Sequence, residues 1–456
     1  MLNKSEHNCS NKNIKGGFIL LTNPVVISVI VMTVLSLLKL NVILALIMAA
    51  LVGGTLSGLS IGETMSTLVG GMGGNAETAL SYILLGALAA SIHKTGLAAI
   101  LAKNMAKWMQ GKGTVLILII AFVASLSQNL IPVHIAFIPI LIPPLIGVMN
   151  KLKIDRRAVA VALTFGLKAP YLALPVGFGL IFHNIIRDQM IENGMQVTNS
   201  MIASVMWVPA LGMVIGLILA VFYTYKNERE YKSLEELDLA DEINGKQKIE
   251  KFNTSHFVAL VGAAAALAIQ LITDSLPLGA IVALTIMLVF RAIKWKDIDD
   301  LVNDGIGMMG FIAFVMLVAS GYGAVIRETG QVAVLVENVS ALMGDSSLIS
   351  AFIMVFVGLI VTMGIGTSFG TIPILAVIYV PLATATGFSP LATIALIGTA
   401  AALGDAGSPA SDSTLAPSAG LDIDGQHDHI WDTCVPTFIH FNIPIMIFGI
   451  IAALVF

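Results

Sequence analysis

The stretch GDAGSPASDST at residues 404–414 carries residue types that could bind a cation inside an otherwise apolar chain. It holds two carboxylates, three serines, one threonine, two glycines and a proline. Backbone groups freed by glycine and proline cannot face lipid, so such a stretch must line a cavity or be buried in protein. There it offers oxygens and helix ends to an ion. We predict that the ion-binding residues are Asp405, Ser411, Asp412, Ser413 and Thr414.

Three other stretches combine polar residues with glycine and proline in the same way: SLSQNLIPVH (125–134), GLKAPYLALPVGFG (166–179) and GIGTSFGTIP (364–373). Tight helix packing alone explains single glycines such as Gly86, but not this recurring combination. Helix N-termini at such places could offer amides to a carboxylate of the cargo. We predict that the substrate-binding residues are Gln128, Asn129, His134, Lys168, Thr367, Ser368 and Ser408. For His134, a role in capping a hairpin is an equal alternative.

Lys168 and Asp405 are predicted to form a pair. Both fall where a long apolar segment is broken by proline. An ionised residue at the bilayer centre costs at least about 2.5–3.5 kcal/mol, so such residues face the interior and find partners. Lys168 could neutralise Asp405 when no cation is bound, or bind the carboxylate of an amino-acid cargo. The structural alternative is that Lys168 snorkels to the cytoplasmic interface.

The composition indicates that these residues belong to a polytopic helical membrane protein. Charged residues make up 11% of the 456 positions, against about 25% in soluble domains. Several apolar runs reach the roughly 20 residues that cross a bilayer as helix. The net charge of −4 offers no basic surface for nucleic acid. Only Cys9 and Cys434 are present, which excludes a disulfide framework.

An internal repeat organises the chain. IHKTGLAAILAKNM at Ile92 resembles IRETGQVAVLVENV at Ile326, and IPIL at Ile138 recurs at Ile372, both at an offset of 234 residues. We therefore expect a first repeat at 1–225, a charged cytoplasmic linker at 226–255 and a second repeat at 256–456.

The charges predict that the two repeats are inverted. Lys103, Lys107 and Lys112 precede the run 114–150, and four basic residues follow it, so both ends of that run lie in the cytoplasm. The equivalent run, about 347–385, is followed by the uncharged TATGFSP, which indicates an external end. Inverted repeats with broken helices are typical of secondary transporters, whose site lies near the midplane. The expected fold is an all-α polytopic membrane protein with two inverted-topology repeats, re-entrant hairpins and broken transmembrane helices.

The C-terminal part resembles a known family. GDAGSPASDSTLAPSAG followed by DGQHDHIWDTCVPTFIHFNIP is similar to the C-terminal signature of the Na⁺/H⁺ antiporter family (NhaC-like) of the ion transporter superfamily. The resemblance implies inverted repeats with re-entrant hairpins and a scaffold domain that can form a homodimer. Some members exchange Na⁺ for H⁺, whereas others resemble amino-acid permeases, with histidine among the solutes.

The resulting expectation is an ion-coupled secondary carrier, multi-pass in a bacterial inner membrane, with Na⁺ or H⁺ as coupling ion and no organic cofactor. Its partners are membrane lipid, the coupling cation and a small solute such as histidine. Plain Na⁺/H⁺ exchange without organic cargo is the close alternative, and an ion channel is the alternative that only uphill uptake excludes.

Two patterns favour other chemistry weakly. ALGD at 402–405 resembles the GxGD of intramembrane aspartyl proteases, but such a dyad needs a second aspartate on another span, and none is evident. HDH at 427–429 could bind a metal or sense pH. A hydrogen-bonded loop that anchors the last helix is the preferred interpretation.

Overall fold

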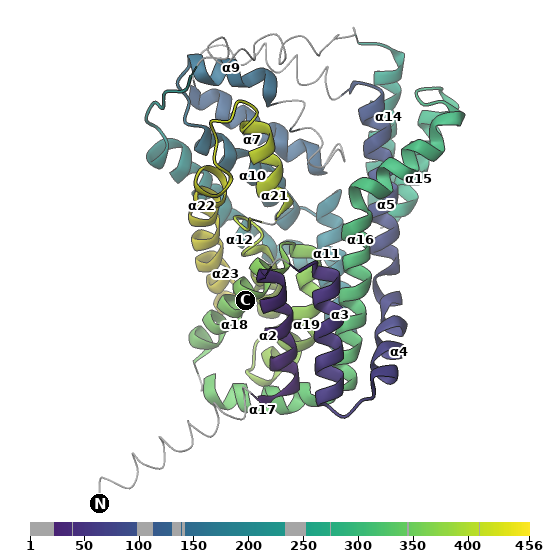
Figure 1. Cartoon of the computed structure of the whole chain (residues 1–456), viewed down its shortest axis with the longest axis vertical. Helices are drawn as coiled ribbons and strands as arrows, with labels where there is room; N and C mark the ends of the chain where they lie inside the picture. Colours follow the sequence, from purple (N-terminus) through teal and green to yellow (C-terminus); the bar gives the residue numbers. More distant parts are fainter. Residues whose placement is uncertain are drawn as a thin grey trace, which may run out of the picture.

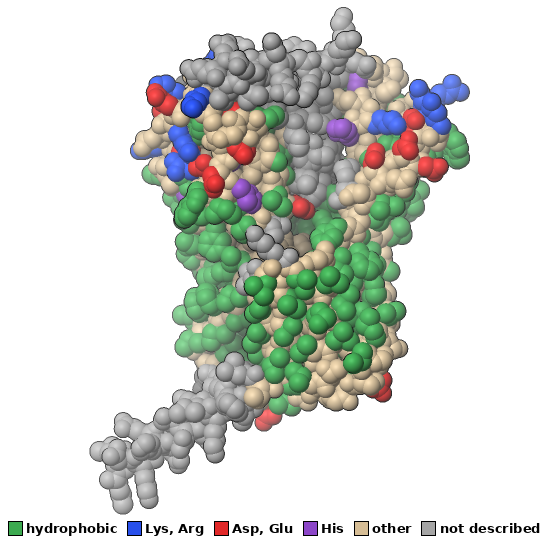
Figure 2. All heavy atoms as spheres, viewed as in Figure 1, with side chains coloured by type: hydrophobic (Ala, Val, Ile, Leu, Met, Phe, Trp, Pro, Cys, Tyr) green, Lys and Arg blue, Asp and Glu red, His purple; other side chains and the backbone are tan. Residues whose placement is uncertain are grey.

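The computed structural model describes residues 22–38, 40–97, 113–129, 138, 142–232, 252–273, 275–343, 346–409 and 411–456. All regular elements in these residues are helices. Seven are long and apolar enough to cross a membrane, or eight if one bent pair counts as a single span. Figure 2 shows hydrophobic side chains as a broad band across the visible face of the molecule, with most of the charged side chains gathered at the upper end. The prediction of an all-α polytopic membrane protein is confirmed.

The helices fall into two sets along the chain (Figure 1). The first contains α2 (Pro24–Leu37), α3 (Val42–Leu56), α4 (Ile61–Gly71), α5 (Ala76–Lys94), α7 (Gly113–Asn129), α9 (Pro143–Lys151), α10 (Arg156–Ala173), α11 (Phe178–Glu192) and α12 (Asn199–Leu219). The second contains α14 (Thr254–Thr273), α15 (Leu276–Val289), α16 (Ile298–Glu328), α17 (Gln331–Met343), α18 (Ser347–Ile365), α19 (Ser368–Ala385), α20 (Pro390–Ala402), α21 (Asp412–Leu421), α22 (Val435–Thr437) and α23 (Ile443–Val455).

The two sets correspond at the offset that the sequence repeat predicts. A shift of 234 residues carries the first residues of α3, α7, α10 and α11 onto the first residues of α15, α18, α20 and α21. In Figure 1, α2 and α3 lie in the lower half of the molecule, whereas their counterparts α14 and α15 lie in the upper half. This arrangement supports inverted repeats. The domain limits 1–225, 226–255 and 256–456 stay a prediction, and residues 233–251 of the linker lie outside the described residues.

One predicted span starts earlier than expected. The sequence suggests a helix near residues 79–98, but an apolar helix runs from Ile61 to Lys94, through a 3₁₀ turn at Met72–Asn75. A capping box between Ser60 and Glu63 fixes its start. Two of its glycines serve close packing, because a Cβ on Gly71 would lie 2.4 Å from the Cβ of Ala324 and a Cβ on Gly74 would lie 2.6 Å from the Oγ of Ser320, both on α16. These two glycines therefore mark a helix–helix contact.

Two membrane elements are broken where the sequence predicts. The α10–α11 pair bends by 48°, and the break is confined to residues 174–177 because the helix continues through Pro170 to Ala173. Between α20 and α21, residues 403–409 and 411 lie outside the helices. Gly404 and Gly407 have φ of +78° and +118° there, a conformation that glycine adopts without strain.

The α18–α19 hairpin supplies the third irregular stretch. α18 ends at Gly366, which has a left-handed conformation, and α19 begins two residues later at Ser368. The turn thus lies inside the predicted GIGTSFGTIP stretch. The corresponding turn of the first half, after Asn129, lies outside the described residues.

Candidate functional site

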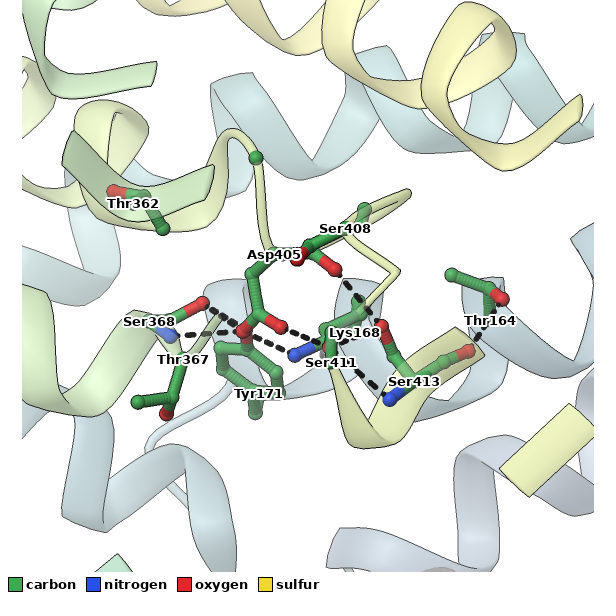
Figure 3. Close-up of polar contacts among 12 residues, drawn as sticks. Thr164, Lys168, Tyr171, Thr362, Thr367, Ser368, Asp405, Ser408, Ser411 and Ser413 are labelled. Atoms are coloured by element: carbon green, nitrogen blue, oxygen red, sulfur yellow. Dashed lines mark hydrogen bonds and ion pairs between the residues drawn. The ribbon is translucent and has the colours of Figure 1, made fainter. Parts of the chain in front are cut away.

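Asp405 is the centre of a buried polar cluster (Figure 3). It belongs to the break after α20 and is 1% exposed. Its Oδ2 accepts hydrogen bonds from the backbone N–H of Ser368, at 2.8 Å, and from the Ser368 hydroxyl. The same oxygen forms an ion pair with the Nζ of Lys168, while Oδ1 accepts from the Ser411 hydroxyl. The carboxylate is therefore bound by donors from three separate parts of the chain.

The N-terminus of α19 is directed at this carboxylate. The first N–H groups of a helix have no partner within the helix and carry partial positive charge. Thr367, at the N-cap, makes no side-chain capping hydrogen bond. Asp405, 37 residues beyond Ser368 in the chain, takes that role and so joins the hairpin tip to the break after α20.

Lys168 approaches Asp405 from α10. Lys168 is 8% exposed, and its ammonium also lies 5.4 Å from the centre of the Tyr171 ring. The hydroxyl of Tyr171 is hydrogen-bonded to the hydroxyl of Ser368 at 2.8 Å. The predicted contact between Lys168 and Asp405 is present, and the snorkelling alternative is wrong for this conformation because the side chain is buried.

The start of α21 closes the cluster. Ser411 is its N-cap and accepts a hydrogen bond from the backbone N–H of Ser413 at 3.2 Å. The Ser413 hydroxyl donates to the backbone carbonyl of Asp405 at 3.1 Å. Thr164 on α10 donates to the carbonyl of Ser413 at 2.8 Å. These bonds fix both flanks of the break against α10.

A cavity of about 30 Å³ adjoins the carboxylate. A water molecule needs about 10–15 Å³ measured in this way, so the cavity has room for one ion or a water molecule, and a larger solute requires it to widen. Its walls come from α5, α10, α11, α16, the α18–α19 turn and the start of α21, through Tyr82, Leu167, Lys168, Phe178, Ile312, Gly366, Thr367, Phe369, Asp405, Ser411, Asp412 and Ser413.

Most of the predicted site residues meet here. Seven of them contact the Asp405 carboxylate or line its cavity: Lys168, Thr367, Ser368, Asp405, Ser411, Asp412 and Ser413. Two others hold the loop, because the Ser408 hydroxyl donates to the carbonyl of Met363 at 3.5 Å and the Thr414 hydroxyl to that of Ser411 at 2.9 Å. Neither lines the cavity. The side chains of Gln128 and Asn129, and the whole of His134, lie outside the described residues.

The sequence analysis missed the aromatic members of the site. Tyr171 could have been found, because the offset of 234 carries Asp405 back onto position 171. Tyr82 and Phe369 carry no such signal. Aromatic residues are common in apolar helices, and only the packing of α5 against α16 brings Tyr82 to the cavity.

A second buried ion pair lies at the charged end of the same elements. Arg156 begins α10, and its Nη1 and Nη2 atoms donate to Oδ1 and Oδ2 of Asp424 at 2.6 and 2.5 Å. The guanidinium also donates to the carbonyl of Leu421 and to Asn150. Burial opposes ionisation of Asp424, but the bonds and charge of Arg156 outweigh it and lower the pKa of Asp424 below its usual value.

The HDH segment that follows is a hydrogen-bonded loop, as preferred. His427 bonds to the Thr433 hydroxyl at 2.7 Å, and His429 bonds to the Ser418 hydroxyl at 2.7 Å and to the carbonyl of Pro409 at 3.0 Å. In the part of the chain that the structure describes, no group of three or more His, Cys, Asp or Glu side chains could hold a metal ion.

The sequence model of the Na⁺/H⁺ antiporter family matches residues 162–450, which include α10–α11 beyond the first residues of α10 and the second half up to the middle of α23. The chain belongs to the Na⁺/H⁺ antiporter family. A second model, of the Na⁺-H⁺ antiporter family, matches residues 23–109. The Asp405 cluster therefore lies in the family-defining part of this transporter, and the family assignment made from the C-terminal signature is confirmed.

Relatives of this antiporter-family chain are bacterial membrane proteins. It is 51% identical over 445 residues to an uncharacterized membrane protein of Vibrio parahaemolyticus, covering 95% of this chain and all of that protein. It is 46% identical over 448 residues, with the same coverage, to a Bacillus subtilis protein named "Putative amino acid transporter YuiF".

Solved transporters share the fold. The MtrF structure of Neisseria gonorrhoeae, described as illuminating a class of antimetabolite efflux pumps, matches with a TM-score of 0.59 at 13% identity, over 90% of this chain and 94% of that one. The Alcanivorax borkumensis YdaH transporter matches with a TM-score of 0.56 at 14% identity, over 86% and 87%. Together with the family, these folds make the protein a multi-pass secondary transporter.

Proposed function

We propose that this protein is a cation-coupled carrier of a small amino acid in a bacterial inner membrane, with Na⁺ or H⁺ bound at Asp405. The observation that carries the proposal is the buried ion pair of Asp405 with Lys168, held by Ser368 and Ser411 beside a cavity. Its partners are then membrane lipid, the cation and the solute. The homodimer implied by the family resemblance stays a prediction.

The ion pair couples cation and solute through charge balance. With Lys168 beside it, the Asp405 carboxylate is neutralised without a cation. A cation that binds Asp405 replaces the ammonium, and the hydroxyls of Ser368 and Ser411 can rotate to present lone pairs to it. A proton has the same effect by neutralising the carboxylate. Lys168 is then a buried cation without its partner, which is costly inside a membrane protein.

The cargo carboxylate is the natural new partner for Lys168. An amino acid that brings its carboxylate to the ammonium restores the balance, so cation and solute each favour binding of the other. The name of the Bacillus subtilis relative supports an amino acid as cargo. Histidine is the leading candidate from the sequence resemblance.

Na⁺/H⁺ exchange without organic cargo is the second candidate. The small size of the cavity favours it, since about 30 Å³ accommodates a dehydrated cation and no amino acid. In that case Na⁺ and H⁺ bind the Asp405 carboxylate alternately. Lys168 neutralises the carboxylate after one cation has left and before the other binds.

Reconstitution of the purified protein in proteoliposomes distinguishes these functions. Labelled histidine and the other standard amino acids are offered under an imposed Na⁺ or H⁺ gradient, while an enclosed dye reports pH. We expect uphill accumulation of at least one amino acid under one of the gradients, which also excludes a channel. Na⁺-driven proton efflux with no solute uptake would reverse the ranking of the two candidates. Liposomes containing Asp405→Asn protein serve as the matched control.

A further inference from the structure

Tyr82 stands apart from the other buried tyrosines of the site region. It lies on α5, is 1% exposed, and lines the cavity beside Asp405. Its hydroxyl is buried and has no hydrogen-bond partner among the residues that the structure describes. Buried polar groups are nearly always hydrogen-bonded, so each exception asks for an explanation.

Three comparable tyrosines show how the fold normally treats a buried hydroxyl. Tyr171 bonds to the Ser368 hydroxyl at 2.8 Å, and Tyr322 bonds to the Ser28 hydroxyl at 3.1 Å. Tyr379 donates to the backbone carbonyl of Met354. All four side chains are at most 3% exposed. The hydroxyl that lacks a protein partner is thus that of the one tyrosine among these four that lines the cavity beside Asp405.

The cavity that Tyr82 lines has an apolar part and a charged part. Its ring packs against Phe369 with centroids 5.8 Å apart in an edge-to-face arrangement, and against Phe178 at 6.0 Å. Both phenylalanines line the cavity, as do two aliphatic side chains, Leu167 and Ile312. The rest of the lining includes the charged side chains of Lys168, Asp405 and Asp412. An occupant that satisfies both parts has a charged head and an uncharged apolar or planar side chain.

The charges of the cavity lining determine the net charge that the cargo can carry. They comprise the carboxylates of Asp405 and Asp412 and the ammonium of Lys168, a net charge of −1. One monovalent cation at Asp405 together with a zwitterion leaves the lining neutral, whereas an acidic side chain adds an uncompensated negative charge. A low-dielectric site favours the neutral combination.

We propose that Tyr82 is a cargo-binding residue that donates its hydroxyl hydrogen bond to the carboxylate of a zwitterionic amino acid with an uncharged, preferably aromatic or other planar, side chain. The side chain packs against Phe178 and Phe369. This inference rests on the proposed amino-acid transport. The contact forms in a conformation in which the cavity is wider than about 30 Å³.

The test is Tyr82→Phe, which removes one oxygen and keeps the ring. Wild-type proteoliposomes are first offered each standard amino acid in labelled form, and the one accumulated fastest serves as probe. A hydrogen bond to a charged group corresponds to roughly a 10-fold change in affinity, so KM for the probe should rise about that much. The cation concentration for half-maximal uptake should stay at the wild-type value. Tyr322→Phe, which removes a buried hydroxyl outside the cavity, should keep the wild-type KM.

A second variant tests the aromatic wall. Phe178→Leu should weaken inhibition by unlabelled aromatic amino acids more than inhibition by unlabelled alanine. Equal weakening of both classes would contradict packing of the cargo side chain on this wall.

The outcomes separate this inference from the proposed function. If the wild type accumulates an amino acid and Tyr82→Phe has an unchanged KM, the role of Tyr82 is wrong and the transport function stands. If the wild type exchanges Na⁺ for H⁺ and takes up no amino acid, both proposals are wrong. A melting temperature measured in detergent guards against misfolding. Tyr82→Phe should melt no lower than wild type, because it removes an unpaired hydroxyl, and a lower melting temperature with unchanged KM assigns the hydroxyl a structural role.

Discussion

Two buried ion pairs join α10 to the chain that follows α20, and they differ in construction. Arg156 and Asp424, at the charged end, form a two-bond fork in which both side chains are 0% exposed. Lys168 lies farther along α10 than Arg156. It meets Asp405, in the break after α20, beside a cavity. The same two parts of the fold are thus linked once by a fully enclosed pair and once by a buried pair that adjoins a cavity.

The residue types explain the difference. A guanidinium is always charged and offers five donors in a fixed plane, and Arg156 uses four bonds to Asp424, Leu421 and Asn150. An ammonium is a point charge on a flexible stem, and the other side-chain donors on Asp405 are hydroxyls, which can turn to accept a cation. The arginine pair is built to persist, and the lysine pair is the one that can exchange its partner.

The largest expected effect belongs to Asp405→Asn. The substitution keeps the shape of the side chain and removes the charge that binds the cation. We expect uphill solute accumulation in proteoliposomes to disappear, while the melting temperature shows that the protein is folded. Asp422→Asn, which neutralises an exposed carboxylate near the charged end, should accumulate solute like wild type. Accumulation by Asp405→Asn would remove this residue from the coupling step.

Arg156→Ala should act on stability instead. Removing one partner of a buried pair leaves an uncompensated charge and typically costs about 3–5 kcal/mol of unfolding free energy, which thermal melting in detergent measures. Protein that remains folded should still couple uptake to the cation gradient. Arg156→Lys should recover little, since lysine cannot form the fork. A wild-type melting temperature in Arg156→Ala, together with lost coupling, would contradict this assignment. The Arg156–Asp424 pair would then act in coupling and not in stability.

The pH dependence of the melting temperature also tests the stabilising role of the Arg156–Asp424 pair. Because the pKa of Asp424 is lowered in the folded protein, its stabilising contribution is present above the usual aspartate pKa. It is lost as the pH falls through the lowered value. Asp424→Asn should therefore melt with less dependence on pH in that acidic range than the wild type. An unchanged acidic dependence in the variant would contradict this assignment.

Lys168→Ala should abolish coupled transport and also lower the melting temperature, because Asp405 is then a buried carboxylate without its counter-ion. The double variant Lys168→Ala/Asp405→Asn removes both charges and should melt higher than either single variant. Additive losses in the double variant would show that the two side chains do not interact energetically.

Ser411→Ala should have the smallest effect. It removes one hydroxyl from Asp405 and leaves the pair with Lys168 in place. Loss of one hydrogen bond to a charged group corresponds to about 1.5 kcal/mol, or roughly a 10-fold weaker apparent affinity for the coupling cation. Ser28→Ala removes a buried hydroxyl outside the cavity lining and should leave that affinity unchanged. Equal shifts in both variants would point to a general loss of packing.

The sequence was sufficient for the features that repeat or break a pattern. The offset of 234 residues places the starts of several helices correctly, since duplicated segments keep their lengths. Polar residues with glycine and proline in an apolar chain mark Asp405 and Thr367, because lipid excludes such backbone. Lys168 and Asp405 could be paired because both are ionisable residues in apolar segments interrupted by proline, at near-equivalent positions of the two repeats.

Other features depend on packing that one sequence does not encode locally. Arg156 finds Asp424 across 268 residues, and its position at the start of a helix suggests an ordinary cytoplasmic charge. The sequence suggests a span that starts near residue 79, whereas the helix begins at Ile61 and packs closely against α16 at Gly71 and Gly74. Ser408 and Thr414 have the composition of ligands, and only the course of the loop shows that they bind backbone carbonyls instead.

Chemical labelling of Lys168 tests whether a cation at Asp405 displaces this lysine. Purified protein is treated with a small amine-reactive reagent, and mass spectrometry compares Lys168 with the half-exposed Lys153 as internal reference. Labelling is measured in Na⁺ against choline at several pH values. We expect Na⁺ or acidification to raise the labelling of Lys168 relative to Lys153, and Asp405→Asn to show the raised level under all conditions. Relative labelling of Lys168 that is unaffected by cation, pH and the Asp405→Asn substitution would contradict this displacement.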